Sequence, residues 1–373
     1  MTSILISGAS VAGPALAYLL RRRGFTVTVV ERAPAPRPGG QAIDVRGAAL
    51  TVAERLGILA DLQRCRTRMK GMSMLDGDGN ELWRSTEVAF SSGRLDSDDV
   101  EVLRDDLTGL LYDRTRQDVE YVFGDSITSL VQDEHGAHVT FERSAPRTFD
   151  LVVGADGLHS NVRGLAFGPE RDFVHHLGTY VSIFSTDNYL GMEDWQTWFN
   201  DGTVGGAIYP VRGNAELRVN IGFQSEDPVE YDHRDVQAQK RLVAERLAHA
   251  GWEVPRLLKA MWGAPDFYFD SMAQVRMDRW SAGRVTLLGD AGYCASPLSG
   301  QGSSLALIGA YVLAAELGRS DHETALAAYE ARMRPFVELN QGLIEQNREH
   351  MEQDPTGDSP VDRVKNAIRL PEL

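Results

Sequence analysis

The sequence predicts an α/β protein in which a domain built on a parallel β-sheet is interrupted by a smaller domain with a mainly antiparallel β-sheet. Three observations lead to this prediction. A strand, a glycine-containing turn, a helix and a second strand follow one another over residues 4–31. Short strand-like segments rich in aromatic residues occupy residues 171–275, and the alternation of strand and helix returns with "RVTLLGD" at residues 284–290.

The first elements form a βαβ unit. "ILIS" (4–7) and "TVTVVE" (26–31) have the composition of buried strands, and "GASVAGPALAYLLRRRG" (8–24) between them has helical spacing. Pro14 suits the first turn of this helix, and Gly24 suits its C-terminal cap. Dinucleotide-binding domains begin with such a unit.

The turn "GASVAG" carries a dinucleotide-binding pattern. Gly8 permits the tight turn, and Gly13 lets helix and strand pack closely. A pyrophosphate would lie against backbone N–H groups at the positive end of the helix. Glu31, at the end of the second strand, can accept hydrogen bonds from a ribose diol. Ser10 replaces the middle glycine of the pattern, so its side chain must point away from the phosphate or hydrogen-bond it.

The middle of the chain predicts the second domain. "GMSMLDGDGNELWRS" (71–85) alternates around a polar turn, as a hairpin does, and "GGAIYPV" and "ELRVNIGFQ" have the composition of strands. "LGILADLQRC" and "DVEVLRDDLTGLLYDRTR" have helical spacing. The expected nucleotide-binding domain comprises residues 1–70, 100–170 and 276–320, and the expected substrate-binding domain comprises residues 71–99 and 171–275.

The C-terminal part predicts a long helix and a tail. Residues 321–352 have helical spacing and are expected to bridge the two domains. Pro335 should kink or split this helix, because proline removes a backbone donor. Residues 353–373 are polar and contain prolines, so we expect a loosely attached tail.

Composition narrows the classes of function. Thirty-eight basic and fifty-three acidic residues give a net charge of −15, which argues against nucleic acid or an anionic membrane surface and favours small-molecule ligands. Two cysteines, Cys65 and Cys294, form no CxxC motif or disulfide framework, which fits a reducing cytoplasm. The sequence has no signal-peptide pattern and no apolar run long enough to span a bilayer. We therefore expect a cytoplasmic protein without a membrane span.

No metal site is expected. "DGDGNE" (76–81) imitates the start of a calcium loop, but Glu81 occupies the position where such a loop needs glycine, so a hairpin turn is expected. His175 and His176 lack the spacing of a helical metal site. Cys294 has no histidine near it in sequence, so we expect a buried small residue there and not a nucleophile.

Three stretches together resemble the signatures of one family. "GASVAG" with Glu31 and Arg32, "LVVGADGLHSNVR" (151–163) and "RVTLLGDAGYCASPLSGQG" (284–302) are similar in order and spacing to those of the group A flavin monooxygenases, which share the fold of p-hydroxybenzoate hydroxylase. "GGQAIDVRGAALTVAERLGI" and "VLRDDLTGLL" look most like the branch that includes tetracycline-inactivating monooxygenases. The resemblance implies a Rossmann-type, GR2-like FAD-binding domain.

The resemblance also implies roles around the flavin. Asp290 would accept hydrogen bonds from ribityl hydroxyls, Pro297 would lie beside the isoalloxazine, and the backbone of residues 300–302 would approach the ring at a helix N-terminus. Asp156 would tether its loop and serve both FAD and NAD(P)H, and Arg104 would contact pyrophosphate or ribityl oxygens. The expected cofactor-binding residues are Gly8, Ser10, Val11, Ala12, Gly13, Glu31, Arg32, Asp44, Arg46, Arg104, Asp156, Asp290, Pro297, Gly300, Gln301 and Gly302.

Four of the charged residues leave alternatives open. Arg163 either contacts the pyridine nucleotide or is a solvated surface arginine. Asp44 and Arg46 either line the outer side of the flavin or belong to a surface turn. Arg32 either lies over the adenine or is a solvated charge.

The resemblance implies a hydroxylase in which the flavin carries the chemistry, so no side chain is expected to be catalytic. NADPH or NADH would reduce the flavin as a transient co-substrate, and O2 would form a C4a-hydroperoxide. One oxygen would then pass to an aromatic or polycyclic substrate, for which a polyketide or tetracycline-like antibiotic is a candidate. The aromatic residues expected to contact that substrate are Tyr180, Trp198, Tyr209 and Phe223.

Two other functions stay open at this point. A NAD-only Rossmann dehydrogenase would use the glycine turn but leave "GDAGYCASPLSGQG" without a purpose. A flavin-holding, ligand-sequestering protein without turnover is suggested only by Ser10. A monomer or weak homodimer is expected.

Overall fold

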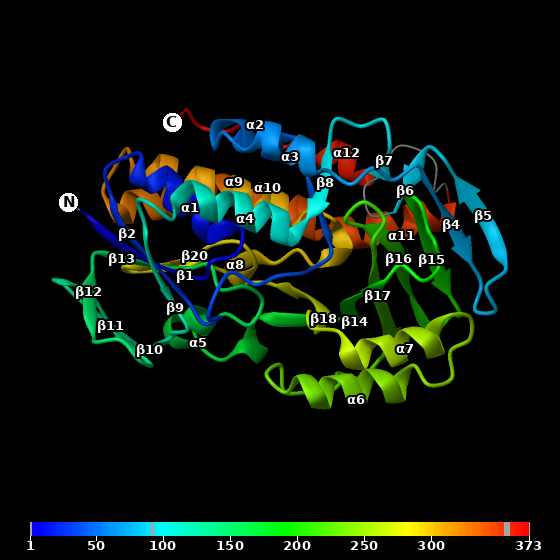
Figure 1. Cartoon of the computed structure of the whole chain (residues 1–373). Helices are drawn as coiled ribbons and strands as arrows, with labels where there is room; N and C mark the ends of the chain where they lie inside the picture. The colour runs from blue at the N-terminus through cyan, green and yellow to red at the C-terminus, as the bar shows by residue number, and fades with distance from the viewer. Residues whose placement is uncertain (1, 91–92, 354–358, 373) are drawn as a thin grey trace.

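The computed structural model describes residues 2–90, 93–353 and 359–372. Over these residues the fold is the predicted one, with a parallel sheet, a second and largely antiparallel sheet, and a long C-terminal helix. Figure 1 shows the two sheets side by side, with helices α1, α4, α9 and α10 above the parallel sheet and α6 and α7 beneath the other. None of the helices in the described ranges has the length and apolarity that a membrane-crossing helix requires.

The parallel sheet has six strands, with β1 near its centre. In spatial order the strands are β19 (Ser281–Ala282), β20 (Val285–Leu287), β13 (Leu151–Gly154), β1 (Ser3–Ser7), β2 (Thr26–Glu31) and β9 (Glu120–Phe123). All neighbours are parallel except β19, which pairs antiparallel with β20 at the edge. The carboxyl ends of β1, β2, β13 and β20 therefore lie at one edge of the sheet, where ligands bind in folds of this class.

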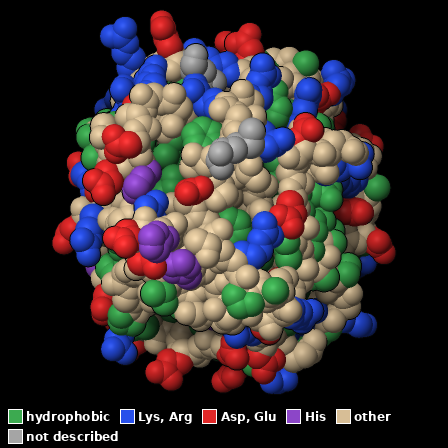
Figure 2. Space-filling model, turned by 90° about the vertical axis from the view of Figure 1, so that its left-hand side faces the viewer, with side chains coloured by type: hydrophobic (Ala, Val, Ile, Leu, Met, Phe, Trp, Pro, Cys, Tyr) green, Lys and Arg blue, Asp and Glu red, His purple; other side chains and the backbone are tan. Residues whose placement is uncertain are grey.

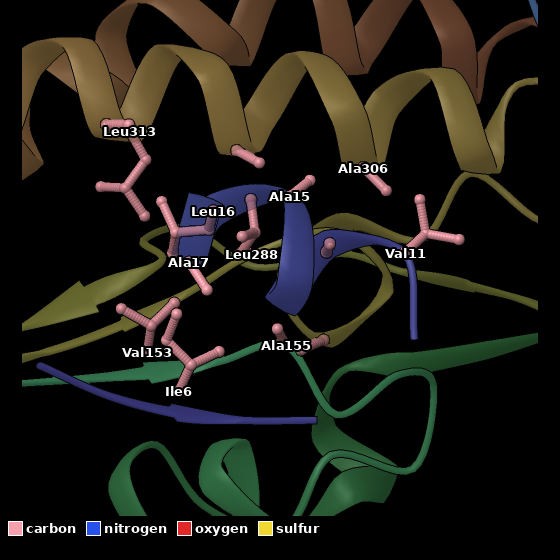
Figure 3. Packing of buried hydrophobic residues seen from close by; sticks show 14 of the residues in the cluster. Ile6, Val11, Ala15, Leu16, Ala17, Val153, Ala155, Leu288, Ala306 and Leu313 are labelled. Carbon is pink, nitrogen blue, oxygen red and sulfur yellow. The ribbon is translucent and has the colours of Figure 1, made fainter. Parts of the chain in front are cut away.

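Helix α1 (Ala12–Arg21) packs between this sheet and α9 (Gly302–Leu317), as Figure 3 shows. Small side chains line the contact, among them Ala15 of α1 and Ala306 of α9. Fourteen of the sixteen residues of α9 are buried, so this helix lies in the centre of the larger core. Burial on all sides accounts for the apolar run that comes after Gly302 in the sequence.

The second sheet has seven strands. In spatial order they are β18 (Tyr268–Val275), β14 (Val174–Asp187), β17 (Glu216–Gln224), β16 (Val204–Val211), β15 (Trp195–Asn200), β4 (Gly71–Leu75) and β5 (Glu81–Ser85). β4 and β5 form the expected hairpin, and β15 pairs parallel with β4. Helices α6 (Val236–Arg246) and α7 (Val254–Gly263) cover one face and share a hydrophobic core with it.

The other face of the seven-stranded sheet meets a two-stranded ribbon of β3 (Ala42–Val45) and β8 (Val100–Leu103). The sequence pattern predicted helix across residues 99–116, but its first part is strand β8, and the helix is α4 (Arg104–Thr115). Val100 and Val102 of β8 face the larger core and are buried, which accounts for the alternating pattern there.

The remaining elements complete the connections. They are α2 (Ala48–Arg55), α3 (Leu59–Cys65), β6 (Val88–Ala89), β7 (Gly93–Arg94), β10 (Ile127–Asp133), β11 (Gly136–Phe141), β12 (Arg147–Phe149), α5 (Asn161–Ala166), the 3-10 turns η1 (Glu170–Asp172) and η2 (Pro297–Ser299), α8 (Asp290–Tyr293), α10 (His322–Gln341), α11 (Leu343–Gln353) and α12 (Pro360–Val364).

The expectation that Pro335 could split the C-terminal helix is wrong. Helix α10 runs unbroken through Pro335 and ends at Gln341, just before Gly342. The buried side chains of Met333 and Phe336 hold this part of α10 against the core, which offsets the one hydrogen bond that a proline removes.

The expectation of a loosely attached tail is also wrong for residues 359–372. Val361 and Val364 of α12 are buried in a small cluster with Leu343. The Tyr311 hydroxyl donates a hydrogen bond of 2.9 Å to the Pro371 carbonyl oxygen. Apolar side chains spaced along the polar tail give it this contact area, so residues 359–372 are part of the fold.

Candidate cofactor-binding site

The residues expected to bind the cofactor lie directly after strands that end at one edge of the parallel sheet. Gly8 comes after β1, Glu31 ends β2, Asp156 comes after β13 and Asp290 comes after β20. Since these strands are parallel neighbours, the four positions lie along one line across the sheet edge. The structure thus brings together residues that are up to 282 positions apart (290 − 8).

The glycine turn has the close approach that the pattern predicts. Gly8 has φ of +109°, and a Cβ atom there would lie 2.3 Å from the Ala155 carbonyl oxygen. A Cβ atom on Gly13 would lie 2.0 Å from the Gly8 carbonyl oxygen. No side chain of the described residues caps the N-terminus of α1, where Val11 is the N-cap. Its first N–H groups therefore remain available to a phosphate.

Glu31 is fixed against this turn. Its Oε2 accepts a hydrogen bond of 2.9 Å from the Ala9 N–H, and its Oε1 accepts one of 2.8 Å from the Ala33 N–H. The carboxylate lines a small cavity together with Ser10, Arg37 and Arg104. Ser10 is thus placed at the mouth of the glycine turn and is partly exposed.

Two arginines give that cavity a positive charge. Arg104 Nη2 donates a hydrogen bond of 2.8 Å to the Gly39 carbonyl oxygen. Burial and then the charge of Arg37 lower the pKa of Arg104. Two cations held together in this way favour a phosphate as a ligand. The sequence analysis missed Arg37. Its position in the loop "APAPRPGG", shortly after Glu31, is the feature from which it could have been found.

Asp156 tethers its own loop, as expected. It accepts hydrogen bonds from the Ser160 hydroxyl at 2.5 Å, the Val162 N–H at 3.1 Å and the Ser7 hydroxyl at 3.3 Å. Burial raises the pKa of Asp156, and these hydrogen bonds oppose the increase. The loop after β13 is therefore joined to the end of β1.

The placement of Arg163 overturns one alternative. Its side chain is fully buried, and it donates hydrogen bonds to the Ala291 carbonyl oxygen at 3.0 Å and the Leu158 carbonyl oxygen at 2.6 Å. Arg163 Nη2 also lies 3.2 Å from Glu170 Oε2. It is not a solvated surface arginine, because these contacts join α5 to α8.

The segment after β20 offers polar groups to a ligand. Asp290 begins α8, and its surface is accessible to solvent and so to a ligand. Desolvation by the protein atoms packed around it raises the pKa of its carboxyl group. Ser296 and Gly300, with φ of +73° and +65°, turn the chain around the exposed Pro297. Helix α9 then begins at Gly302 without a side-chain cap within the described residues.

Gln301 gives the clearest sign of a missing partner. Its side chain is fully buried, and neither its amide nitrogen nor its amide oxygen has a hydrogen-bond partner in the described part of the chain. A buried amide without partners costs several kcal/mol, roughly 1–3 per group in proteins. The donors and acceptors at the edge of a flavin ring would supply those partners, so the residues present fit FAD.

Asp44 and Arg46 form a buried ion pair of 2.8 Å. Burial raises the pKa of Asp44 to about 7, although Arg46 opposes this. The alternative of a surface turn is therefore wrong. The Arg46 guanidinium lies 3.8 Å from the Cβ position of Gly300, beside the segment that leads into α9. Arg32, in contrast, is exposed at the end of β2.

The aromatic candidates divide between the two faces of the seven-stranded sheet. Tyr180 and Phe223 are buried in the core between the sheet and helices α6 and α7. Trp198 and Tyr209 lie on the opposite face, with Leu103 of the ribbon. The Tyr209 hydroxyl accepts a hydrogen bond of 2.9 Å from the Ala42 N–H, so only this second pair faces the ribbon.

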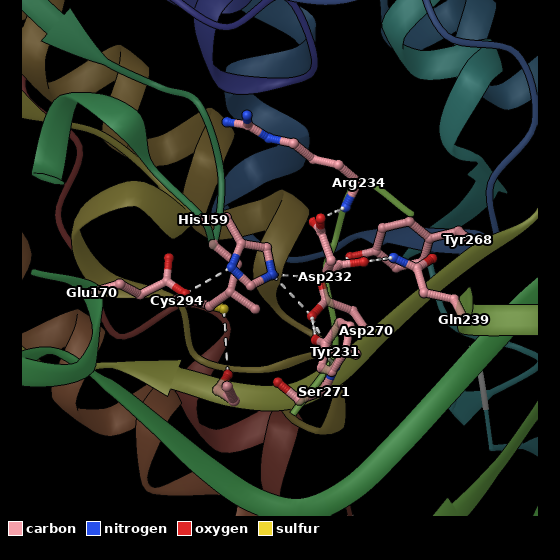
Figure 4. Close-up of polar contacts among 12 residues, drawn as sticks. His159, Glu170, Tyr231, Asp232, Arg234, Gln239, Tyr268, Asp270, Ser271 and Cys294 are labelled. Carbon is pink, nitrogen blue, oxygen red and sulfur yellow. Dashed lines mark hydrogen bonds and ion pairs between the residues drawn. The ribbon is translucent and has the colours of Figure 1, made fainter. Parts of the chain in front are cut away.

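A polar network missed by the sequence analysis joins the two sheets. His159, in the loop after β13, lies between Glu170 at 2.9 Å and Asp270 of β18 at 3.1 Å (Figure 4). Asp270 also accepts hydrogen bonds of 2.6 Å from the hydroxyls of Tyr231 and Tyr268. Burial would lower the pKa of His159, but the hydrogen bonds to Asp270 and Glu170 raise it to about 9. The network therefore holds a charged imidazolium.

A second histidine extends this network. The rings of His159 and His233 stack with centroids 4.8 Å apart. Figure 2 shows histidine side chains gathered beside acidic ones on one face, where basic and acidic side chains are otherwise interspersed. His159, within "GADGLHSNVR", is the residue from which the sequence could have indicated this network.

Known proteins of similar sequence and structure match most of this chain. A family model described as "FAD binding domain" matches residues 1–341. An uncharacterized protein of Mycobacterium tuberculosis (strain ATCC 25618 / H37Rv) is 53% identical over 350 residues, which are 93% of this chain and 94% of that protein. A flavin-dependent monooxygenase of an unknown prokaryotic organism is 40% identical over 341 residues, 91% of this chain and 88% of that one. The crystal structure of the tetracycline destructase Tet(51) matches with a TM-score of 0.90 and 34% identity, over 100% of both chains.

Proposed function

This chain belongs to the FAD binding domain family and is a flavin-dependent monooxygenase, and from that premise we propose that it uses NADPH or NADH and O2 to hydroxylate an aromatic or polycyclic small molecule. Membership of this family overturns the alternative of a NAD-only dehydrogenase. The observation that carries the proposal is the buried amide of Gln301, which has no partner in the described residues and directly precedes Gly302, whose Cβ position lies 4.0 Å from Asp290 Oδ1.

The residues of this chain would hold FAD along the sheet edge. The N–H groups at the start of α1, with Arg37 and Arg104, would bind the pyrophosphate, and Glu31 the ribose. Asp290 and Gln301 would bind the ribityl chain and the ring. When bound, FAD supplies the redox chemistry that activates O2. The task of the chain is to orient the cofactor and the substrate and to exclude water.

We place the substrate between the ribbon and the seven-stranded sheet. There Trp198 and Tyr209 form a small apolar cluster with Leu103 of the ribbon. Met69 packs against the same cluster. The proposed substrate residues are therefore Trp198 and Tyr209. Tyr180 and Phe223 are left out because they face the core that α6 and α7 cover.

The similarity to tetracycline destructase Tet(51) supports a polycyclic substrate of tetracycline-like or polyketide type.

The test is substrate-stimulated oxidation of NADPH and NADH by the flavin-loaded protein under air. Phenols, polyketides and tetracyclines are compared, and each product is examined by mass spectrometry for one added oxygen atom. The proposal predicts that a polycyclic compound accelerates oxidation and gains one oxygen. Oxidation at the same rate with and without every compound, and no oxygenated product, would contradict it.

A further inference from the structure

The C-terminal segment, residues 359–372, packs against the start of α2. The Lys365 carbonyl oxygen accepts a hydrogen bond of 3.2 Å from the Ala48 N–H, at the first residue of α2. Figure 1 shows the C-terminus beside α2, with α12 at the end of α3. This segment therefore covers the turn between β3 and α2.

Lys365 points its ammonium group into this contact. Nζ lies 2.8 Å from Asp99 Oδ2 and 2.6 Å from Asp362 Oδ1. The side chain of Lys365 is 16% exposed and that of Asp99 is 8% exposed. Lysine is rarely buried to this extent unless it is paired, so the pair with Asp99 fixes where the segment lies.

Asp99 carries the contact into the β3–α2 turn. Its second oxygen, Oδ1, accepts a hydrogen bond of 3.0 Å from the Gly47 N–H. Gly47 has φ of +53°, and a Cβ atom there would lie 2.6 Å from the Lys365 carbonyl oxygen. The backbone of the turn therefore packs directly against the Lys365 carbonyl group. Its hydrogen bond goes to Asp99, the aspartate that pairs with Lys365.

Arg46, the residue before Gly47, contacts the start of α9, which we expect to face the flavin. The Arg46 N–H donates a hydrogen bond of 3.0 Å to the Ser304 hydroxyl in the first turn of α9. The Arg46 guanidinium pairs with Asp44 at 2.8 Å and lies 3.8 Å from the Cβ position of Gly300. A continuous chain of contacts therefore runs from Lys365 to the start of α9.

A contribution to stability does not by itself account for the buried ion pairs of Lys365 with Asp99 and of Arg46 with Asp44. A buried ion pair contributes little net stability, because desolvation of both ions offsets their attraction, and apolar residues of similar size often serve as well. What the pair does provide is a defined position for the groups that it contacts.

We propose that Lys365 is a positioning residue for the flavin: through Asp99 it fixes the β3–α2 turn and so holds Arg46 beside Gly300 and Ser304. This inference rests on the FAD site of the proposed function. It concerns the binding of the cofactor and is independent of the substrate.

The experiment compares Lys365→Met, Lys365→Arg and the control Arg363→Met in the full chain. Arg363 is an exposed residue of α12, the short helix that Lys365 caps, so its replacement removes an equal charge away from Asp99. For each variant, the deflavinated protein is titrated with FAD to obtain Kd, the visible absorption spectrum of the bound flavin is recorded, and the thermal midpoint is measured without FAD.

Lys365→Met should raise the Kd for FAD by about tenfold, the size typical for partners that orient a ligand-binding group, and should shift the flavin spectrum. Lys365→Arg and Arg363→Met should retain the affinity and spectrum of the wild type. A Lys365→Met protein with wild-type Kd and spectrum would overturn the proposal, whatever its thermal midpoint, because Lys365 would then be structural only.

If Lys365→Met does not fold, the double variant Asp99→Asn/Lys365→Met replaces it, since no unpaired charge remains buried. Weakened FAD binding by the folded double variant supports the proposal, and wild-type affinity overturns it. These readouts are separate from turnover. A wild-type protein that oxidises none of the tested substrates would count against the proposed function and leave the FAD affinities interpretable.

Discussion

Gly13 approaches Gly8 so closely that a Cβ atom on Gly13 would lie 2.0 Å from the Gly8 carbonyl oxygen. The other atom is backbone and cannot move aside, so a side chain here must displace α1 from the sheet. We predict that Gly13→Ala abolishes FAD binding and lowers the free energy of unfolding by roughly 2 kcal/mol or more. FAD titration and urea denaturation measure the two effects.

Gly109→Ala is the matched control for this prediction. Gly109 lies within helix α4 and has open space where its Cβ atom would be. Alanine is the better helix former, so this change should stabilise the protein by up to about 1 kcal/mol. If Gly13→Ala behaved like Gly109→Ala, the close approach would not exist in the protein.

The second prediction concerns Asp290. Asp290→Ala should weaken FAD binding strongly, because the ribityl hydroxyls lose the carboxylate at the end of β20 that we expect to accept their hydrogen bonds. Fluorescence titration of the deflavinated variant with FAD measures the loss. Asp278→Ala, at an exposed aspartate in the chain before β19, should bind FAD as the wild type does. Equal affinity in both variants would show that Asp290 is misassigned.

The third prediction concerns the pH dependence of stability. The pKa of His159 is raised to about 9 in the folded protein, where Asp270 and Glu170 hold its charged form against the effect of burial. A raised pKa gives stability that is complete below the unfolded value, about 6.5, and is lost as pH rises through the folded value. The wild type should therefore exceed His159→Gln in unfolding free energy by on the order of 2 kcal/mol near pH 6.

The difference between these two proteins should shrink as pH rises through about 9. Urea denaturation of both proteins at intervals from pH 6 to pH 10 gives the profile. A difference that stays constant across this range would mean that the ring of His159 is not charged between the two carboxylates.

The fourth prediction concerns the ion pair of Arg218 and Asp266, whose side chains are 2% and 9% exposed and lie 2.5 Å apart. Arg218→Met leaves the Asp266 carboxylate buried without its cation and should cost roughly 3 kcal/mol of stability. Arg218→Met/Asp266→Leu should recover much of that loss, because no buried charge remains. A double variant no more stable than the single one would contradict the account of this pair.

The elements nearest the cofactor site were the most predictable from sequence. Local rules determine the residues at each strand end: Gly8 must be in a tight turn, Glu31 must end β2, and Asp290 must open the next helix. Parallel strands then bring these positions to one edge without further information. This is why a sequence pattern alone could place residues that are far apart in the chain.

The features that could not be predicted depended on contacts between distant segments. Strand alternation predicts that an aromatic residue faces one side of a sheet but not which element covers that side, so Tyr180 and Trp198 could not be told apart. The continuity of α10 at Pro335 depends on the core beneath it. The position of Lys365 depends on Asp99, which lies 266 residues earlier, and nothing in the local sequence signals that pairing.

The most direct test of the central claim is a crystal structure of the protein loaded with FAD. The account predicts that the isoalloxazine lies against residues 296–302, that the Gln301 amide gains a hydrogen-bond partner there, and that Asp290 bonds the ribityl chain. A flavin bound elsewhere, or a Gln301 amide still buried without a partner beside the bound ring, would contradict it.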